Sequence, residues 1–307
     1  MTMDALAAVV TLLKPQTLLS KIVQGRGRWG VRYPAYGQPS FALVLDGSCW
    51  LAAEGMPATQ LCAGDFILFS ITPGFTLASD LNVKPKPMRI PRPEDHVGEV
   101  VHGDPSAESS ATLLGGGFAF DPVNASMLVH LLPKMLHIRA TDPAIGGVAP
   151  IVELIKRETS SQRPGQALVL TRLIEIILVE ALRSVPPDVH STGLLAGLRD
   201  AQLSAALRSI HLKTSHPWTL ESLARQAGMS RSSFADRFAR VVGETPLNYL
   251  LQWRIALAKN KLVHEELTVA QTALAVGYQS ASAFSTAFSR ETGRSPKEFA
   301  EQRRATN

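Results

Sequence analysis

One segment near the end of this chain occurs twice, and that repeat constrains the fold more than any other feature. Residues 230–250 read SRSSFADRFARVVGETPLNYL, and residues 280–300 read SASAFSTAFSRETGRSPKEFA. A shift of fifty positions aligns identical residues, among them Ser230 with Ser280, Phe234 with Phe284, Phe238 with Phe288, Arg240 with Arg290, Gly243 with Gly293 and Pro246 with Pro296. A repeat of this kind indicates one supersecondary unit that is built twice.

Each copy has the signals of a helix-turn-helix. A hydroxyl residue can cap each helix by accepting a hydrogen bond from a free amide of the first turn, and glycine suits the tight turn between the helices. A glycine and a hydroxyl–proline pair then end the second helix and start the next one. These signals are Thr219, Gly228, Ser230, Gly243 and Thr245-Pro246 in the first copy, and Thr268, Gly277, Ser280, Gly293 and Ser295-Pro296 in the second. Gln279 lengthens the second turn by one residue, and the pattern is typical of the motif.

The second helix of each copy is expected to be a recognition helix that enters DNA. Its two phenylalanines are four residues apart and therefore face inward together. The opposite face carries small polar residues and a terminal arginine, which suit close approach to a major groove. We predict DNA contacts at Arg231, Ser232, Ala235, Asp236 and Arg240 in the first copy, and at Ser282, Ser285, Thr286 and Arg290 in the second. In a single copy this pattern could be an ordinary solvent-exposed face. Its occurrence in two copies, in the same register, favours DNA recognition.

Asp236 is unusual among these residues because phosphate repels a carboxylate. It could accept a hydrogen bond from a cytosine amino group, or it could pair with a neighbouring arginine. The sequence leaves both partners open.

The segment between the copies predicts a connecting helix. Its sequence, PLNYLLQWRIALAKNKL, runs from Pro246 to about Leu262, and apolar residues recur in it at helical spacing: Leu247, Leu250, Leu251, Ile255, Ala258 and Leu262. Seventeen residues of helix span about 25 Å, whereas successive major-groove faces lie roughly 34 Å apart. If the helix sets a shorter spacing, the DNA must bend or one recognition helix must engage poorly.

Residues from about 200 to 304 resemble the DNA-binding domain of the AraC/XylS family of bacterial transcription regulators. The resemblance rests on WTLESLARQAGMSRSSFADRF, on the connecting helix with Arg254, and on AVGYQSASAFSTAFSRETGRSPKEF. It implies two helix-turn-helix subdomains in consecutive major grooves of double-stranded DNA, with RNA polymerase as a further partner. Several family members carry Arg, Gln or Trp at the positions of Ser232, Ala235, Asp236, Ser282 and Thr286, so the base preference of this chain is expected to differ.

Composition and charge fit a soluble regulator. The net charge is +5, and residues 200–307 hold 14 Lys and Arg against 9 Asp and Glu, whereas residues 1–199 hold 17 of each kind. The excess therefore lies on the repeat-bearing part, as phosphate binding requires. The start, MTMDALAAVVTLLKPQ, lacks the pattern of a signal peptide, and no uninterrupted apolar stretch is long enough to span a membrane. We expect a cytoplasmic, nucleoid-associated bacterial protein that does not contact the membrane.

Residues 36–121 predict a β-rich domain. Short apolar runs such as FALVLDG, CWLAA, QLCAGDFILFS and ATLLGGGFAFD alternate with turn signals, which suggests a barrel or sandwich. LLGGGFAFD after a long loop resembles the cupin-like sensor domain of the same family, which implies a barrel that binds a small effector. The fold class predicted is therefore α+β: a sensor domain over residues 1–185, a linker over 186–196, and an all-α, two-part DNA-binding domain over 197–307.

Enzyme activity is not expected. Catalytic cupins hold a metal with clustered histidines and a carboxylate, but no histidine precedes His96, and His96 and His102 lie in or beside the long loop. We therefore predict no metal, no cofactor and no catalytic residue. A DNA-repair alkyltransferase fused to this kind of DNA-binding domain would need a reactive cysteine in a metal cluster, and two cysteines outside that domain do not supply one.

Cys49 and Cys62 leave an alternative open, namely a thiol-based redox regulator that uses no ligand. A turn centred between Gly55 and Met56 would place the two cysteines directly opposite each other on paired strands. Opposed Cβ atoms lie about 4.5–5.5 Å apart, and a disulfide needs about 3.5–4.5 Å, so pairing would require some adjustment. The competing interpretation is that both are small buried apolar residues, since no basic neighbour in the sequence lowers either thiol pKa.

Helices are expected after the barrel, over VNASMLVHLLPKML, VAPIVELIKRETS and residues 166–184, with another at LRDAQLSAALRSIHLK. His130 and His137 are seven residues apart and are expected to be structural. The helix 166–184 has a broad apolar face made of Leu170, Ile174, Ile177, Leu178, Ala181 and Leu182. That face either forms a homodimer interface, as the family resemblance implies, or packs on the barrel.

Overall fold

The computed structural model describes residues 5–89, 99–121, 123–125, 133–141, 148–161, 163–183 and 192–306. These residues form two compact units. The helical unit contains helix α1 (Ala5–Leu13), the described residues between 120 and 125, and the chain from residue 192 onward; the β unit contains residues 15–119 and the described residues between 133 and 183. The fold is α+β, as predicted.

The β unit is a mixed sheet that curves into a cupin-like half-barrel. Along its main path the strands are ordered β7-β2-β6-β3-β9-β1-β8, with β4, β5 and β10 paired at its sides. The strands are β1 (Gln16–Arg26), β2 (Gly30–Tyr33), β3 (Ser40–Ala53), β4 (Thr59–Cys62), β5 (Phe66–Phe69), β6 (Phe75–Ala78), β7 (Lys86–Pro87), β8 (Glu99–Gly103), β9 (Ser109–Ala119) and β10 (Met135–Ile138).

Strand β3 connects the two halves of this sheet. The runs FALVLDG and CWLAA, predicted as two strands, are parts of this single strand, whose first half pairs with β5 and β9 and whose second half pairs with β4 and β6. The register of its pairing with β9 shifts between Val44 and Asp46. Gly47 follows with φ of +71°, and a Cβ there would lie 2.1 Å from the Ser110 carbonyl oxygen, so the bend requires glycine.

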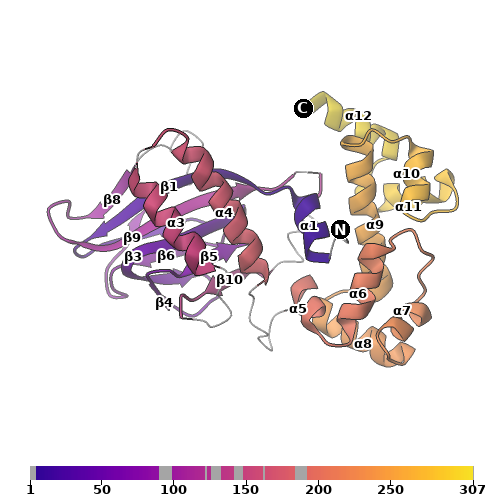
Figure 1. Cartoon of the computed structure of the whole chain (residues 1–307), viewed down its shortest axis with the longest axis horizontal. Coiled ribbons are helices and arrows are strands. Elements are labelled where there is room, and N and C mark those ends of the chain that lie inside the picture. The colour runs from indigo at the N-terminus through magenta and orange to yellow at the C-terminus, as the bar shows by residue number, and fades with distance from the viewer. Residues whose placement is uncertain are drawn as a thin grey trace. The chain divides into compact units, whose positions relative to one another are not determined.

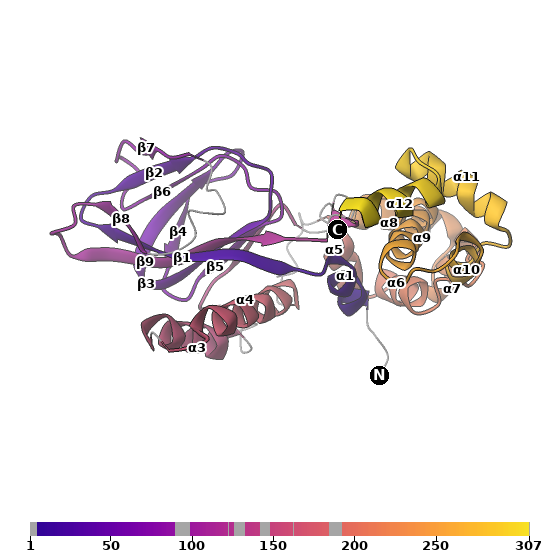
Figure 2. The same ribbon diagram turned by 90° about the horizontal axis from the view of Figure 1, so that it is seen from above.

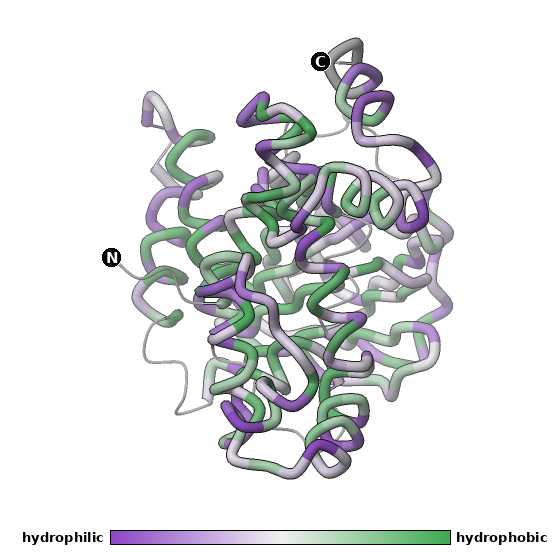
Figure 3. The backbone as a smooth tube through the Cα atoms, turned by 90° about the vertical axis from the view of Figure 1, so that its right-hand side faces the viewer, coloured by the Kyte–Doolittle hydropathy of each residue, from purple (hydrophilic) through white to green (hydrophobic). Residues whose placement is uncertain are grey.

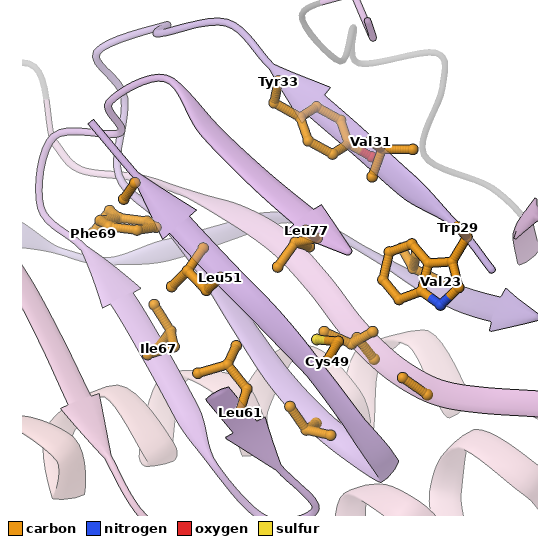
Figure 4. Packing of buried hydrophobic residues seen from close by; sticks show 14 residues of the cluster. Val23, Trp29, Val31, Tyr33, Cys49, Leu51, Leu61, Ile67, Phe69 and Leu77 are labelled. Carbon is orange, nitrogen blue, oxygen red and sulfur yellow. The ribbon is translucent and has the colours of Figure 1, made fainter. Parts of the chain in front are cut away.

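The half-barrel is filled by apolar side chains, because alternate residues of each strand point to the same face. Figure 4 shows this packing, with Cys49, Leu51, Leu61 and Leu77 directed into one cluster. Trp29 completes the cluster, and its indole Nε1 donates a hydrogen bond to Ser110 Oγ at 2.9 Å.

Helices α3 (Val148–Ser161) and α4 (Gln166–Arg183) lie side by side along one face of the sheet (Figure 2). The six apolar residues predicted as one face of α4 are all buried, so this face packs within the β unit. The helix predicted over VNASMLVHLLPKML is wrong at its last two residues, because Met135 and Leu136 begin strand β10 (Met135–Ile138), which pairs with β5. His130 and residues 186–191 of the predicted linker lie outside the described residues.

Strand β10 shows why that helix prediction failed. Leu136 and Ile138 are buried, and Met135 and His137 are half-buried, which is the period-two pattern of a strand. His137 is structural, as predicted, because its Nε2 pairs with the buried Asp65 carboxylate at 3.0 Å.

The helical unit contains the repeat. Figure 1 shows α9 between one group of helices, α6 to α8, and a second group, α10 to α12. The helices are α5 (Leu194–Arg199), α6 (Leu203–Leu212), α7 (Leu220–Gln226), α8 (Arg231–Val242), α9 (Pro246–Val263), α10 (Val269–Ala275), α11 (Ala281–Thr292) and α12 (Pro296–Thr306). In Figure 3 apolar and polar residues alternate within single turns of these helices, as amphipathic helices require.

The segment predicted as one helix over LRDAQLSAALRSIHLK is broken at Asp200. The Asp200 Oδ1 atom accepts hydrogen bonds from the amides of Gln202 and Leu203, each at 3.0 Å. An aspartate that satisfies these amides starts a new helix, so α5 ends before it and α6 begins after it.

Two segments from the first half of the chain also belong to the helical unit. The side chain of Asp121 is 7% exposed, and its carboxylate pairs with Lys14 at 3.6 Å and with His264 at 2.6 Å. Val123 is buried in the apolar cluster of the second helix-turn-helix. The domain boundaries predicted from the sequence place residues 1–14 and 120–125 in the sensor domain, and these boundaries stay a prediction. In the structure, the described residues of both segments pack with the helical unit.

Candidate DNA-recognition surface

The two helix-turn-helix motifs have the caps that the sequence predicted. The hydroxyls of Thr219 and Ser230 accept from the amides of Ser222 and Ser233, and those of Thr268 and Ser280 accept from the amides of Gln271 and Ala283. Gly243 and Gly293 end α8 and α11 with φ of 85° and 74°, a conformation that favours glycine. Each motif therefore begins and ends its recognition helix by the same local interactions.

The inward faces of α8 and α11 are equivalent. Phe234 and Phe238 are fully buried with their ring centroids 5.6 Å apart, and Phe284 and Phe288 are fully buried with centroids 5.5 Å apart. Residues four apart lie on one face of a helix, so burial of both phenylalanines fixes which face of each helix points inward. The face turned to solvent is therefore the same on both helices.

The structure places every predicted contact residue on those outward faces. Arg231, Ser232, Asp236, Arg240, Ser282, Thr286 and Arg290 are exposed, and Ala235 and Ser285 are half-buried at equivalent positions. Their roles in DNA binding stay predictions.

The two terminal arginines differ in their surroundings. Arg290 Nε lies 3.1 Å from Glu291 Oε1, and Glu291 also accepts a hydrogen bond from Gln252 at 2.7 Å. Arg240 makes no ion pair with any residue that the structure describes. A phosphate that binds Arg290 would therefore compete with a carboxylate, and one that binds Arg240 would not.

The connecting helix α9 is buried on more than one side, which the sequence did not predict. Tyr249, Trp253 and Ala256 are buried together with the predicted Ile255, whereas the predicted Leu247 is 47% exposed. A helix that packs between two motifs has no single apolar face. The prediction of one apolar face was therefore wrong in placing Leu247 in the core.

Arg254 of α9 joins the two motifs, and its role was not predicted. Its Nε donates to the Thr214 carbonyl at 3.1 Å and its Nη2 to the His216 carbonyl at 2.8 Å, both just before α7 of the first motif. Its guanidinium also lies 5.9 Å from the centre of the Tyr278 ring in the second motif. Burial lowers the pKa of Arg254 from its usual value. The sequence marks Arg254 only as part of the family motif in the connecting helix, and its contacts are with residues far away in the sequence.

The predicted register of the two cysteines is wrong. In the pairing of β3 with β4, Cys49 lies opposite Leu61 and Cys62 lies opposite Ser48. The two thiols therefore point to opposite faces of the strand pair. Cys49 is buried, and burial raises the pKa of its thiol to about 12, whereas Cys62 is exposed. A disulfide needs facing Cβ atoms, so nothing in this geometry favours the redox hypothesis.

No other site chemistry stands out in the described parts of the chain. These residues contain no group of three or more His, Cys, Asp or Glu that could hold a metal ion. None of their helices has both the length and the apolar character needed to cross a membrane. His96 lies outside them, and His102 stacks on Trp29 with the ring centroids 6.2 Å apart.

The fold and the exposed faces define a class: a helix-turn-helix DNA-binding protein with a β-rich half-barrel domain. Comparison with known protein families assigns the same two domain types. Residues 4–185 match a family described as cupin, and residues 223–302 match the helix-turn-helix domain family.

The relatives specify the family. A protein of Streptomyces antibioticus named as an AraC-like transcription regulator is 36% identical over 97% of this chain and 98% of its own length. The regulator AlkR of Acinetobacter baylyi is 30% identical over 98% of this chain and 100% of its own length. The chain therefore belongs to the AraC family of DNA-binding transcription regulators.

A solved structure also resembles part of the chain. The DNA-binding domain of AdpA in complex with a target DNA is 28% identical over 35% of this chain and 96% of that chain, with a TM-score of 0.34.

Proposed function

We propose that this regulator binds its operator with both recognition helices at once, and that the residues predicted above make the contacts. The observation that carries the proposal is the equivalence of the two outward faces: both helices keep paired phenylalanines inside and a terminal arginine, Arg240 or Arg290, outside. Arg231, Arg240 and Arg290 would contact phosphates, and the small residues would approach base edges.

A salt series tests the arginine contacts. Affinity for DNA falls with salt in proportion to the phosphates neutralised, so Arg240→Ala and Arg290→Ala should each reduce the slope of log K against log salt by about 0.9. Arg157, an exposed residue of α3 in the β unit, provides the matched control, and Arg157→Ala should leave the slope unchanged. Unchanged slopes for both recognition-helix variants would contradict phosphate contact.

The proposal includes a small effector bound in the half-barrel. Support comes from the match of residues 4–185 to the cupin family, and any effector would lie against the buried apolar cluster that includes Trp29, Tyr33 and Phe69. His102 Nε2 is buried beside Trp29 and has no hydrogen-bond partner among the described residues. Burial lowers the pKa of His102, so the ring is neutral and can hydrogen-bond a polar group of an otherwise apolar ligand. Mass spectrometry of compounds released from the purified chain tests this directly.

Homodimer formation through the helix 166–184 is also proposed, but by its outer side. The predicted apolar face is buried within the β unit, whereas Leu168, Val169 and Ile176 are 62%, 43% and 48% exposed. Sedimentation of Ile176→Glu beside the natural chain tests this interface. RNA polymerase as a partner and a cytoplasmic location follow from the proposed role in transcription.

A further inference from the structure

The carboxylate of Asp236 lies on the outward face of α8, between Ser232 and Arg240. All three side chains are exposed and are spaced four residues apart, so they form one row along the helix. This row is the part of α8 that the proposed function directs at the major groove. Asp236 therefore faces base edges rather than the protein interior.

The structure offers Asp236 no arginine partner. Its neighbour Arg237 is held elsewhere, with the guanidinium 2.8 Å from the buried carboxylate of Asp200. Within the described residues Asp236 takes part in no ion pair, and neither does Arg240 one turn further on. Of the two partners that the sequence left open, the intramolecular one is not formed, and both carboxylate oxygens remain available to DNA.

The equivalent residue in the second motif has different chemistry. Thr286 is exposed at the same position of α11, but it is neutral, and its hydroxyl donates to the Ser282 carbonyl at 3.1 Å. The two recognition helices therefore share a scaffold and differ at this position by one charge. Because the position is exposed on both helices, packing does not explain the difference.

Major-groove chemistry limits what a carboxylate can accept. Guanine presents the acceptors N7 and O6, and thymine presents the acceptor O4, so both repel it. Adenine presents the N6 donor beside the N7 acceptor, which repels the second carboxylate oxygen. Cytosine presents the N4 donor with no acceptor of its own beside it, and it is the base that fits best.

We propose that Asp236 makes the first recognition helix select cytosine at the position it faces, whereas Thr286 leaves the second helix tolerant at the equivalent position. This inference rests on the proposed binding of DNA by both helices. Arg231 and Arg240, exposed on the same helix, offset the repulsion between the carboxylate and the phosphates.

Selection from a random DNA library, with the full-length chain, tests the proposal. The natural chain should enrich cytosine at one position of the first half-site. Asp236→Ala should lower that preference roughly fivefold or more, and Asp236→Asn should shift it to adenine, which asparagine recognises through N6 and N7. Thr286→Asp provides the matched gain of function, because it should create a cytosine preference in the second half-site.

The outcomes separate the inference from the proposed function. If the natural chain and Asp236→Ala enrich the same sequences with the same base frequencies, Asp236 does not select a base and the inference is wrong. The same holds if Asp236→Ala changes affinity equally on every sequence, because the residue then acts only as a surface charge. If the natural chain enriches no sequence at all, the proposed DNA binding fails together with the inference.

Discussion

Gly277 is the turn residue of the second helix-turn-helix, and replacing it by alanine should destabilise the helical unit far more than the same change at its counterpart Gly228. Both glycines have positive φ, +90° and +63°. A Cβ at Gly277 would lie 2.7 Å from the Ser215 carbonyl oxygen and 2.9 Å from Arg254 Nη2, whereas a Cβ at Gly228 would meet nothing within 4 Å. The two positions therefore share backbone strain but not the steric clash.

These distances set the expected magnitudes. A left-handed conformation costs alanine about 1–2 kcal/mol, and this applies to both variants. Forcing a methyl group against fixed backbone atoms costs about 1–3 kcal/mol more, and this applies to Gly277 alone. Gly228→Ala should therefore lower the free energy of unfolding by about 1–2 kcal/mol, and Gly277→Ala by about 2–5 kcal/mol.

Urea unfolding followed by far-ultraviolet circular dichroism measures this difference. Because Ser215 precedes α7 of the first motif, Gly277→Ala also displaces one motif against the other and should weaken binding to DNA that carries both half-sites. Binding of Gly228→Ala should change little. Equal losses of stability in the two variants would refute the idea that the close approach of the two motifs at Gly277 matters.

Two further predictions concern buried groups. Burial lowers the pKa of His211 to about 3, below its ordinary 6.5. Between these two pH values the unfolded chain binds a proton at His211 and the folded chain does not. The free energy of unfolding should therefore fall by roughly 1.4 kcal/mol per pH unit as the pH drops below about 6.5. His211→Leu should flatten this slope in urea unfolding at several pH values, and exposed His216→Leu should not. Cys62 should react with a thiol reagent in the native chain and Cys49 should not, which mass spectrometry of labelled peptides checks; rapid labelling of Cys49 would contradict its burial.

The local signals in the sequence predicted the helical unit well. Caps such as Thr219 and Ser280, stops such as Gly243, and the buried Phe234 depend on interactions within a few residues, so they can be inferred from spacing alone. The outward positions follow from the same period, because fixing the inner face of a helix fixes its outer face.

The break at Asp200 has a local cause, but the other failures of prediction arise from dependence on distant partners. The register of Cys49 against Leu61 is fixed by the pairing of β3 with β6 as well as by its own turn, and a slip of one residue exchanges the two faces. Met135–Ile138 become a strand because β5 offers them a free edge. Arg254 hydrogen-bonds to Thr214, forty positions away in the sequence, and no local pattern reveals that contact.

The internal repeat itself separates structural residues from recognition residues. Positions that are identical and buried in both copies, such as Phe234 and Phe284, are explained by packing. Packing does not explain Arg240 and Arg290, which are identical but exposed. Under the proposed function, their identity corresponds to a feature that both half-sites share, and the phosphate backbone is such a feature.

Exposed positions that differ between the copies have the opposite meaning. Asp236 and Thr286 occupy equivalent exposed positions of α8 and α11, so packing does not account for the difference between them. If the proposed DNA binding holds, the difference corresponds to what the two half-sites do not share, which is their base sequence. A symmetric operator, with the same bases in both half-sites, would leave this difference without a purpose, and we therefore expect the two half-sites to differ in sequence.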